Sequence, residues 1–265
     1  MEAKLTAAAA PHIIVRDLTM AFGAFVLMRD LNFVVNHGDV FIIMGGSGCG
    51  KSTLLRHLIG LIEPAKGEIL YDGFNFTKAA AEERERMVRR FGILYQSGAL
   101  FSSLTLLENV AVPLGEFTRL PGAQIHEIAA LKLALVGLRG FEDYYPNQIS
   151  GGMQKRAGLA RAMALDPDIL FFDEPSAGLD PISSRLLDDL ILELRDSLGS
   201  TIVVVTHELA SIFTIGNNSI FLDPESRTII AQGDPRDLLE RCPELKVRRF
   251  LARGGEQHSL TIGNG

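Results

Sequence analysis

The sequence predicts an α/β fold in which a mostly parallel β-sheet carries helices on both faces. An N-terminal antiparallel β layer precedes this sheet, and a helical subdomain is inserted into it. Three observations lead to this prediction. Short apolar runs typical of buried strands alternate with segments of helical periodicity. A glycine-rich stretch at residues 45–52 joins one such strand to a helix, and residues 104 to about 165 read as almost all helix. In this fold the ligand lies at the carboxyl ends of the parallel strands.

The first two predicted strands belong to the N-terminal layer. They cover residues 12–18 and 31–35, and residues 36–39 form a turn that leads into the next strand. Phe22 lies between these strands. It either stacks on a purine base or is an ordinary core phenylalanine, and the sequence favours neither, because aromatic side chains bury well in both settings.

The glycine-rich stretch meets every fixed position of the phosphate-binding pattern G-x-x-x-x-G-K-[ST], between the apolar strand 40–44 and a helix over 52–59. Its glycines leave backbone N–H groups free to surround a polyanion at the positive end of a helix, and Lys51 adds a full charge. The hydroxyl of Ser52 is placed to bind magnesium between the β- and γ-phosphates. The sequence therefore predicts a nucleotide-phosphate site made of Gly45, Gly46, Ser47, Gly48, Cys49, Gly50, Lys51, Ser52 and Thr53.

The chain then continues the alternation of strands and helices. A strand over 68–73 closes with the Asp72-Gly73 turn, a charged helix covers about 79–90, and a core strand over 91–95 ends at Gln96. Within the helical block, we expect interruptions at Pro113 and at Pro121-Gly122. The remaining predicted elements are an amphipathic helix over 123–136, a strand over 169–172, a helix over about 182–197, a strand over 201–205 and a short strand near 219–222.

Charged side chains follow two of these strands. Asp173 and Glu174 come after the buried strand 169–172, where a phosphate-loop enzyme needs a carboxylate to face magnesium. We assign Asp173 to the metal and Glu174 to the attacking water, although such a pair can also be simply solvated. His207 follows the strand 201–205. It either hydrogen-bonds a γ-phosphate or is a structural or surface histidine.

A second helix start has the features of an anion site. Ser150 is a good N-cap, and Gly151 and Gly152 leave N–H groups open at the positive end of a helix that runs to about residue 165. The alternative is a plain capped helix. Read as a binding site, this start gives the chain a second phosphate-binding element.

Length and composition limit the class of protein. With 265 residues, of which 47% are hydrophobic, the chain can bury a large core in one big or two small domains. We expect a cytoplasmic soluble protein, because no window approaches the roughly 18 apolar residues of a membrane span and the start lacks a signal peptide's apolar segment. Cys49 and Cys242 do not suggest a disulfide. The net charge of −6 opposes a general nucleic-acid role.

These residues, in this order, resemble the motifs of the ATP-binding subunits of ABC transporters, over nearly the whole chain. The matches are Phe22 with the adenine-stacking aromatic, residues 45–52 with the Walker A loop, Gln96 with the Q-loop, Ser150-Gly151-Gly152 with the signature, Asp173-Glu174 with the Walker B pair, Ser176–Asp180 with the D-loop and His207 with the switch histidine. Met153 stands where the family usually has Gln, a departure that bears on subfamily more than on activity.

The resemblance implies a RecA-like form of the sheet and ATP and Mg²⁺ as cofactors. It implies catalytic roles for Glu174, His207 and Lys51, and metal contacts for Ser52, Gln96 and Asp173. Two copies of the chain would form a homodimer that sandwiches two ATP molecules between the Walker A loop of one and the signature of the other. The nucleotide-binding domain would cover residues 12–241, with the helical subdomain at about 100–165 and a tail at 242–265.

Within the family, the chain is similar to the Mla-type ATPases that work with Mce-domain proteins and move phospholipids between bacterial membranes. Four stretches carry this similarity: residues 96–104, 150–153, 180–182 and 206–209. It implies partners at the cytoplasmic face of the inner membrane, namely integral permease subunits, an Mce-domain protein and a small STAS-type protein, and no nucleic acid. We expect residues 99–107 to dock the permease, with Phe101 and Leu104 as exposed anchors.

Three other functions remain alternatives. Oligopeptide importers share the Ser-Gly-Gly-Met signature but resemble this chain less around Gln96. ABC ATPases that act on nucleic acid or the ribosome usually carry tandem cassettes, coiled-coil insertions or zinc insertions, none of which this sequence contains. A GTPase would share only the phosphate loop.

Overall fold

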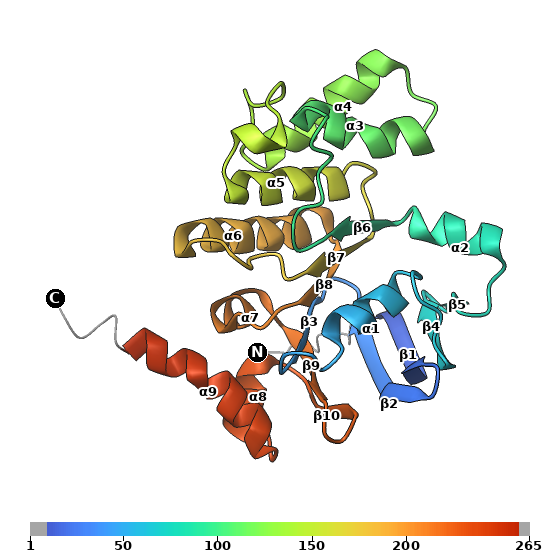
Figure 1. Cartoon of the computed structure of the whole chain (residues 1–265), viewed down its shortest axis with the longest axis vertical. Helices are drawn as coiled ribbons and strands as arrows, with labels where there is room; N and C mark the ends of the chain where they lie inside the picture. The colour runs from blue at the N-terminus through green and yellow to red at the C-terminus, as the bar shows by residue number, and fades with distance from the viewer. Residues whose placement is uncertain (1–9, 260–265) are drawn as a thin grey trace, which may run out of the picture.

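Two β-sheets of different character organise the computed structural model of the chain, which describes residues 10–259 (Figure 1). The first is a four-stranded antiparallel sheet in the order β2-β1-β4-β5. The second has six strands in the order β10-β9-β3-β8-β7-β6, all parallel except β10. The strands are β1 (Pro11–Phe22), β2 (Phe25–Asn36), β3 (Val40–Gly45), β4 (Lys66–Tyr71), β5 (Phe74–Asn75), β6 (Phe91–Leu94), β7 (Ile169–Asp173), β8 (Thr201–Val205), β9 (Asn218–Asp223) and β10 (Thr228–Gln232).

The fold class is the predicted one, with local differences in the strands. β1 and β2 extend far beyond the predicted 12–18 and 31–35 and meet in a hairpin whose last paired residues are Phe22 and Phe25. Asp72 and Gly73 form the expected turn, which joins β4 to the short β5. Strand β10 was not predicted. It is paired antiparallel to β9 at the edge of the sheet. This pairing makes it a strand, and its short apolar run alone is too weak a signal.

Nine α-helices accompany the two sheets over the described residues. They are α1 (Lys51–Leu58), α2 (Ala81–Val88), α3 (Leu106–Phe117), α4 (Gly122–Leu135), α5 (Gly151–Ala162), α6 (Pro181–Leu198), α7 (Leu209–Ile215), α8 (Pro235–Arg241) and α9 (Leu245–Ser259), with a 3₁₀ turn at Pro146–Gln148 before α5. Between residues 10 and 259, none of them is both long and apolar enough to cross a membrane.

Helices α3, α4 and α5 lie together at one end of the molecule, beyond β6 (Figure 1). Pro121 and Gly122 separate α3 from α4 as expected, but the predicted interruption at Pro113 is wrong, because α3 continues through it. The proline ring removes one helical N–H donor. Val110 and Leu114, on either side of it, are buried in the core and keep the helix packed in the block.

The six-stranded sheet has a different core on each face. Successive side chains of a strand point to opposite faces, so Ile42 of β3 joins one apolar cluster and Phe41 joins the other. The cluster with Ile42 includes residues of helices α3 to α9, among them Val247 and Leu251 of α9. The cluster with Phe41 includes α1 and the antiparallel sheet. Both faces of the sheet are therefore covered, and the carboxyl ends of its strands remain as the place for a ligand.

Candidate nucleotide site

The order of the sheet brings the predicted polar residues to one edge. Strand β8 lies between β3 and β7, and all three run parallel, so their carboxyl ends are neighbours. The phosphate loop follows β3, Glu174 follows β7 and His207 follows β8. The backbone N–H of Glu174 donates to the carbonyl of Val205 at 2.8 Å, which extends the sheet by one residue at this point.

Two glycines of the phosphate loop are required by their surroundings. Gly45 has φ 149°, and a Cβ at this position would lie 2.5 Å from the carbonyl oxygen of Leu222. Gly50 has φ 97° and is the N-cap of α1. Both conformations are ones that L side chains rarely adopt. The loop therefore keeps a backbone path that a side chain would block, with Gly46, Ser47 and Gly48 exposed.

Lys51 folds back over this loop. Its Nζ donates to the carbonyl oxygens of Gly45 and Gly46, both at 3.0 Å. The residue is 9% exposed, so the ammonium group is held by the loop rather than by solvent. A phosphate bound by the loop would take these hydrogen bonds over, because an anionic oxygen is a stronger acceptor for an ammonium than a neutral carbonyl.

Ser52 contacts the first Walker B carboxylate directly. Its Oγ donates to Oδ1 of Asp173 at 2.8 Å. Hydroxyl and carboxylate oxygens are the hard ligands that Mg²⁺ prefers, and Mg²⁺ sites commonly combine one or two such groups with phosphate oxygens. The pair therefore fits a magnesium site at the start of α1.

Glu174 is held through one of its two carboxylate oxygens. Its Oε1 lies 2.9 Å from Nδ1 of His207, whereas its Oε2 is buried and has no hydrogen-bond partner among residues 10–259. The residue adopts φ 49°, which is uncommon for a side chain of this size. A buried, unpaired carboxylate oxygen at the same sheet edge as the phosphate loop can accept a proton from a water molecule.

Lys155 of α5 was not singled out from the sequence. Its buried Nζ donates to the backbone carbonyl of Glu174 at 3.3 Å, and burial lowers the pKa of this lysine. The contact joins the signature helix to the carboxylate that follows β7. A lysine within an ordinary helical pattern gives no sequence signal for such a role.

Gln96 is exposed just beyond β6, and the segment after it is fixed to α5. The guanidinium of Arg161 donates to the carbonyl of Ala99 at 2.8 Å and to that of Gly98 at 3.0 Å. The same guanidinium lies 5.8 Å from the centre of the Phe101 ring. No sequence pattern marks Arg161 either, because its partners are backbone carbonyls more than sixty positions away.

Phe22 lies at the end of the hairpin of β1 and β2 and is 52% exposed. The hairpin packs against the phosphate loop. A Cβ built on Gly50 would lie 3.0 Å from Cδ2 of Leu27 and 3.3 Å from Cε of Met20. Phe22 belongs to neither apolar core cluster, so its exposed ring, on a hairpin that packs against the loop, is available to a base.

Ser150 caps α5 as expected. Its Oγ accepts from the N–H of Met153 at 3.3 Å, and Ser150 and Gly151 are exposed. Over residues 10–259, no hydrogen bond connects residues 150–152 with residues 45–53, and α5 lies in the helical block, apart from α1 (Figure 1). The structure of one chain thus does not bring the signature to its own phosphate loop.

Residues 176–180 lead from Glu174 into α6. Asp180 caps this helix by accepting from the N–H groups of Ile182 and Ser183, both at 3.0 Å. Hydrogen bonds from Ser183 lower the pKa of Asp180. Ile182, in the first turn, is 75% exposed, and the buried Oγ of Ser176 has no hydrogen-bond partner within the described part of the chain.

The expected anchors between residues 99 and 107 differ in exposure. Phe101 is exposed, as predicted, but Leu104 is half-buried and Leu106 is fully buried. Asn109 explains the difference, because its buried amide group bonds the backbone N–H and carbonyl of Phe101 and the carbonyl of Leu104. The prediction of Leu104 as an exposed anchor is therefore wrong, since this turn folds around Asn109.

Known proteins share both the sequence and the fold of this chain. A family profile described as ABC transporter matches residues 28–177. The "Intermembrane phospholipid transport system ATP-binding protein MlaF" of Escherichia coli (strain K12) is 41% identical over 236 residues, which are 89% of this chain and 87% of that protein. The "Probable ribonucleotide transport ATP-binding protein mkl" of Mycobacterium tuberculosis (strain H37Rv) is 41% identical over 89% of this chain, but the chain spans only 65% of its length.

A solved structure gives the same result for the fold. The "Dimeric structure of a post-hydrolysis state of the ATP-binding cassette MJ0796 bound to ADP and Pi" superposes with a TM-score of 0.76 at 30% identity. The match covers 84% of this chain and 98% of that one.

Proposed function

The chain belongs to the ABC transporter family, and on this premise we propose that it is the ATP-hydrolysing subunit of a membrane transporter that moves phospholipids. The observation that carries ATP hydrolysis is the set of contacts at one sheet edge: Lys51 on the phosphate loop, Ser52 with Asp173, and Glu174 with His207. The three contacts serve different functions in phosphoryl transfer, namely phosphate binding, metal binding and activation of the attacking water.

Three groups of this chain would act on the nucleotide. Lys51 and the loop N–H groups would hold the phosphates, and Phe22 would stack on the base. Ser52, Asp173 and Gln96 would hold Mg²⁺, which when bound neutralises charge on the β- and γ-phosphates. Glu174 would accept the proton of the attacking water, and His207, hydrogen-bonded to it, would orient the carboxylate and contact the γ-phosphate.

Two copies of the chain would complete each site. The signature residues Ser150, Gly151 and Gly152 lie outside the phosphate-loop contacts of their own chain, and their exposed helix start is suited to bind a phosphate held by another copy. The dimeric state named for the MJ0796 structure supports this arrangement. We propose a homodimer with two shared sites.

The transported molecule is proposed from relatives. The E. coli protein is named for intermembrane phospholipid transport, and it matches this chain over most of both lengths. The mycobacterial protein, equally identical, is named for ribonucleotide transport, which makes ribonucleotides the second candidate. With phospholipid as substrate, the partners would be permease subunits, an Mce-domain protein and a STAS-type protein, and the chain would lie at the cytoplasmic face of the inner membrane.

Transport by the purified complex tests this proposal. The chain is co-expressed with the permease and Mce-domain subunits proposed above, and the complex is reconstituted into vesicles that contain a fluorescent phospholipid. We expect ATP-dependent phospholipid transfer by the parent chain and none by a complex carrying Glu174→Gln. A parallel measurement uses radiolabelled ribonucleotide. ATP-dependent ribonucleotide uptake without lipid transfer would overturn the phospholipid assignment and leave the ATPase assignment intact.

A further inference from the structure

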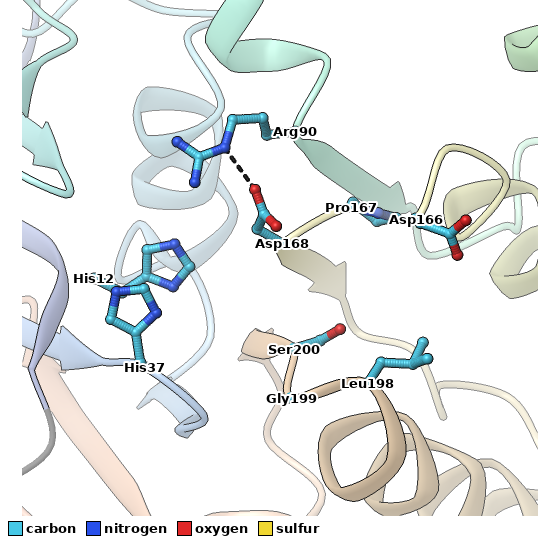
Figure 2. Close-up of a pocket in the computed structure, with 9 residues that line it drawn as sticks. All are labelled: His12, His37, Arg90, Asp166, Pro167, Asp168, Leu198, Gly199 and Ser200. Atoms are coloured by element: carbon cyan, nitrogen blue, oxygen red, sulfur yellow. Dashed lines mark hydrogen bonds and ion pairs between the residues drawn. The ribbon is translucent and has the colours of Figure 1, made fainter.

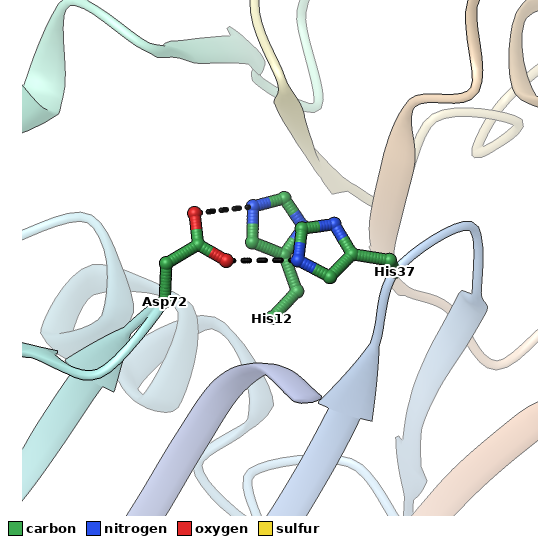
Figure 3. Close-up of side chains that lie close together, drawn as sticks. All are labelled: His12, His37 and Asp72. Carbon is green, nitrogen blue, oxygen red and sulfur yellow. Dashed lines mark hydrogen bonds and ion pairs between the residues drawn. The ribbon is translucent and has the colours of Figure 1, made fainter. Parts of the chain in front are cut away.

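A cluster of three side chains lies at the opposite edge of the core sheet from the nucleotide site. His12 is the second residue of β1, His37 is in the turn between β2 and β3, and Asp72 is in the turn between β4 and β5 (Figure 3). Because β3 has six residues and leads from this edge to the phosphate loop, the two sites are about 20 Å apart. The cluster therefore belongs to no part of the ATPase machinery.

The three side chains converge closely. Nε2 of His37 lies 2.8 Å from Oδ1 of Asp72, and Nε2 of His12 lies 3.7 Å from Oδ2 of the same carboxylate. The two imidazole rings are stacked with 3.8 Å between their centres. One ligand atom from each residue lies within 4.8 Å of those of the other two. Ligand atoms around one tetrahedral zinc ion lie about 3.4 Å apart, so the stacked rings would rotate to turn both nitrogens toward a bound ion.

His12 shows that this convergence is incomplete as it stands. The residue is 2% exposed, and its Nε2 is buried without a hydrogen-bond partner in the part of the chain that the structure describes. Buried polar nitrogens are nearly always paired, so this nitrogen, which lies 3.7 Å from Oδ2 of Asp72 in a ring stacked on that of His37, points to a missing ligand.

The outer contacts of the cluster suit metal binding. Nδ1 of His12 lies 2.7 Å from Oγ1 of Thr201, so the ring can donate its N–H to this hydroxyl and present a lone pair at Nε2. Metal-bound histidines usually have such a partner for their other nitrogen. Nη2 of Arg90 donates to Oδ2 of Asp72 at 3.0 Å and leaves Oδ1 facing His37. Arg90 is itself paired with Asp168, which offsets its charge.

The cluster also opens to solvent. His12, His37, Arg90, Asp168 and Ser200 line a cavity of about 300 Å³ at the amino ends of the core strands (Figure 2). A cavity of this size holds several water molecules. A metal ion at the cluster could therefore be reached from solvent and could take water as its remaining ligand.

We propose that His12, His37 and Asp72 form a binding site for a transition-metal ion, with Zn²⁺ as the ion that fits best. Two imidazoles and one carboxylate are typical zinc ligands, whereas Mg²⁺ and Ca²⁺ favour oxygen. The ion would join the turns after β2 and β4 to the start of β1, and through Thr201 to the start of β8. Zinc should therefore stabilise the contact between the antiparallel sheet and the core sheet.

The experiment uses the full chain, stripped of metal with a chelator and kept free of nucleotide. Zinc is titrated by calorimetry, and thermal unfolding is followed with and without zinc. We expect one equivalent to bind and to raise the melting temperature. Thr201→Val should weaken zinc binding about 10-fold, at the lower end of the effect of losing an outer contact, and His37→Gln and Asp72→Asn, which remove ligands, should weaken it by more than about 100-fold, the upper end of that effect. His37 is half-exposed, so its replacement should leave the fold intact.

Two variants serve as controls. His126→Gln removes an exposed histidine of α4, and His207→Ala removes the histidine that is hydrogen-bonded to Glu174 at the nucleotide site; both should keep the zinc affinity of the parent. Cobalt as a probe should give the visible spectrum of nitrogen and oxygen ligands without thiolate. Parental zinc affinity in both His37→Gln and Asp72→Asn, loss of binding in His207→Ala, or a thiolate spectrum from Cys49 would overturn the proposal. So would a folded parent chain that binds no zinc.

Discussion

Nδ1 of His207 lies 2.9 Å from Oε1 of Glu174, although the two residues are 33 positions apart and follow different strands. Since β7 and β8 are parallel neighbours, their carboxyl ends lie side by side, and Glu174 and His207, which follow these ends, come into contact. The hydrogen bond leaves the second oxygen of Glu174 buried and unpaired within the described residues. This arrangement is the basis of the first prediction.

Glu174→Gln should abolish turnover and keep ATP binding. The amide retains the shape of the side chain but cannot accept a proton, and loss of a general base typically slows a reaction by about 10² to 10⁴-fold. ATPase activity of the membrane complex and ATP binding of the isolated chain are the measurements. ATP hydrolysis at the parental rate would show that another group is the base.

Lys51→Ala should weaken ATP binding itself. The substitution removes the ammonium that now contacts the carbonyls of Gly45 and Gly46. The phosphates then lack its charge-assisted hydrogen bonds, and the affinity for ATP should fall about 10 to 100-fold. Calorimetry with a slowly hydrolysed ATP analogue measures this. Lys78→Ala is the control, because that side chain is 74% exposed and pairs with Glu68 away from the loop.

A mixture of two inactive variants should recover activity if each site is shared by two chains. Lys51→Ala damages the phosphate loop, and Ser150→Arg damages the signature at the exposed start of α5. A heterodimer of the two contains one composite site with both halves intact. ATPase activity of the mixture should exceed that of either variant alone. No recovery in a heterodimer isolated with two different tags would contradict sharing, provided that a heterodimer with only one damaged chain retains activity.

Most of the fold could be predicted from the sequence, and so could the position of several polar residues at the carboxyl edge of the core sheet, whose roles on a nucleotide stay predictions. Short apolar runs that end in polar residues, as at Asp173 and His207, predict both a strand and the position of its carboxyl end. The order of the sheet could not be predicted, because the pairing of β3 with β8 and β9 depends on side chains far apart in the chain.

Other features lacked a sequence signal for a physical reason. Arg161 and Lys155 bind backbone carbonyls, and any residue supplies a carbonyl, so no pattern marks the partner. Pro113 lies within α3 because burial of its neighbours outweighs one lost hydrogen bond. The cluster of His12, His37 and Asp72 joins three turns, and only the assembled antiparallel sheet brings these turns together.

Asp188→Asn should stabilise the chain at neutral pH. Burial raises the pKa of Asp188 from its ordinary 3.8 to about 6, although the hydroxyl of Ser211 donates to it. A raised carboxyl pKa means that folding disfavours the ionised form. The stability this group contributes is therefore complete below about pH 4 and is lost as the pH rises through about 6. At pH 7.5 the replacement should gain about 2 to 3 kcal/mol.

Thermal and urea unfolding at pH 7.5 and pH 4 measure this effect, and the gain should shrink at the lower pH. Glu193→Gln, on an exposed carboxylate of the same helix that is not among the groups acting on Asp188, is the matched control and should change little. An equal gain at both pH values would show that the effect comes from packing and not from ionisation.

Phe101→Asp should prevent assembly with the membrane permease and preserve ATP binding by the isolated chain. Phe101 is exposed, and the segment around it is held on both sides, by Arg161 at Gly98 and Ala99 and by Asn109 at Phe101 itself. The segment begins at Gln96, which the family resemblance places at the γ-phosphate. A partner helix seated on Phe101 would thus be joined to the nucleotide by a short, well-fixed stretch of backbone.

Co-purification with the permease and calorimetry with an ATP analogue measure the two properties. Leu61→Asp is the matched control, because Leu61 is also an exposed apolar residue, at 62%, but follows α1 away from the helical block. It should keep both assembly and ATP binding. Normal assembly of the Phe101→Asp chain would place the docking surface elsewhere. A loss of ATP binding together with a lowered melting temperature would show that Phe101 supports the fold, since Arg161 then loses the ring beside its guanidinium.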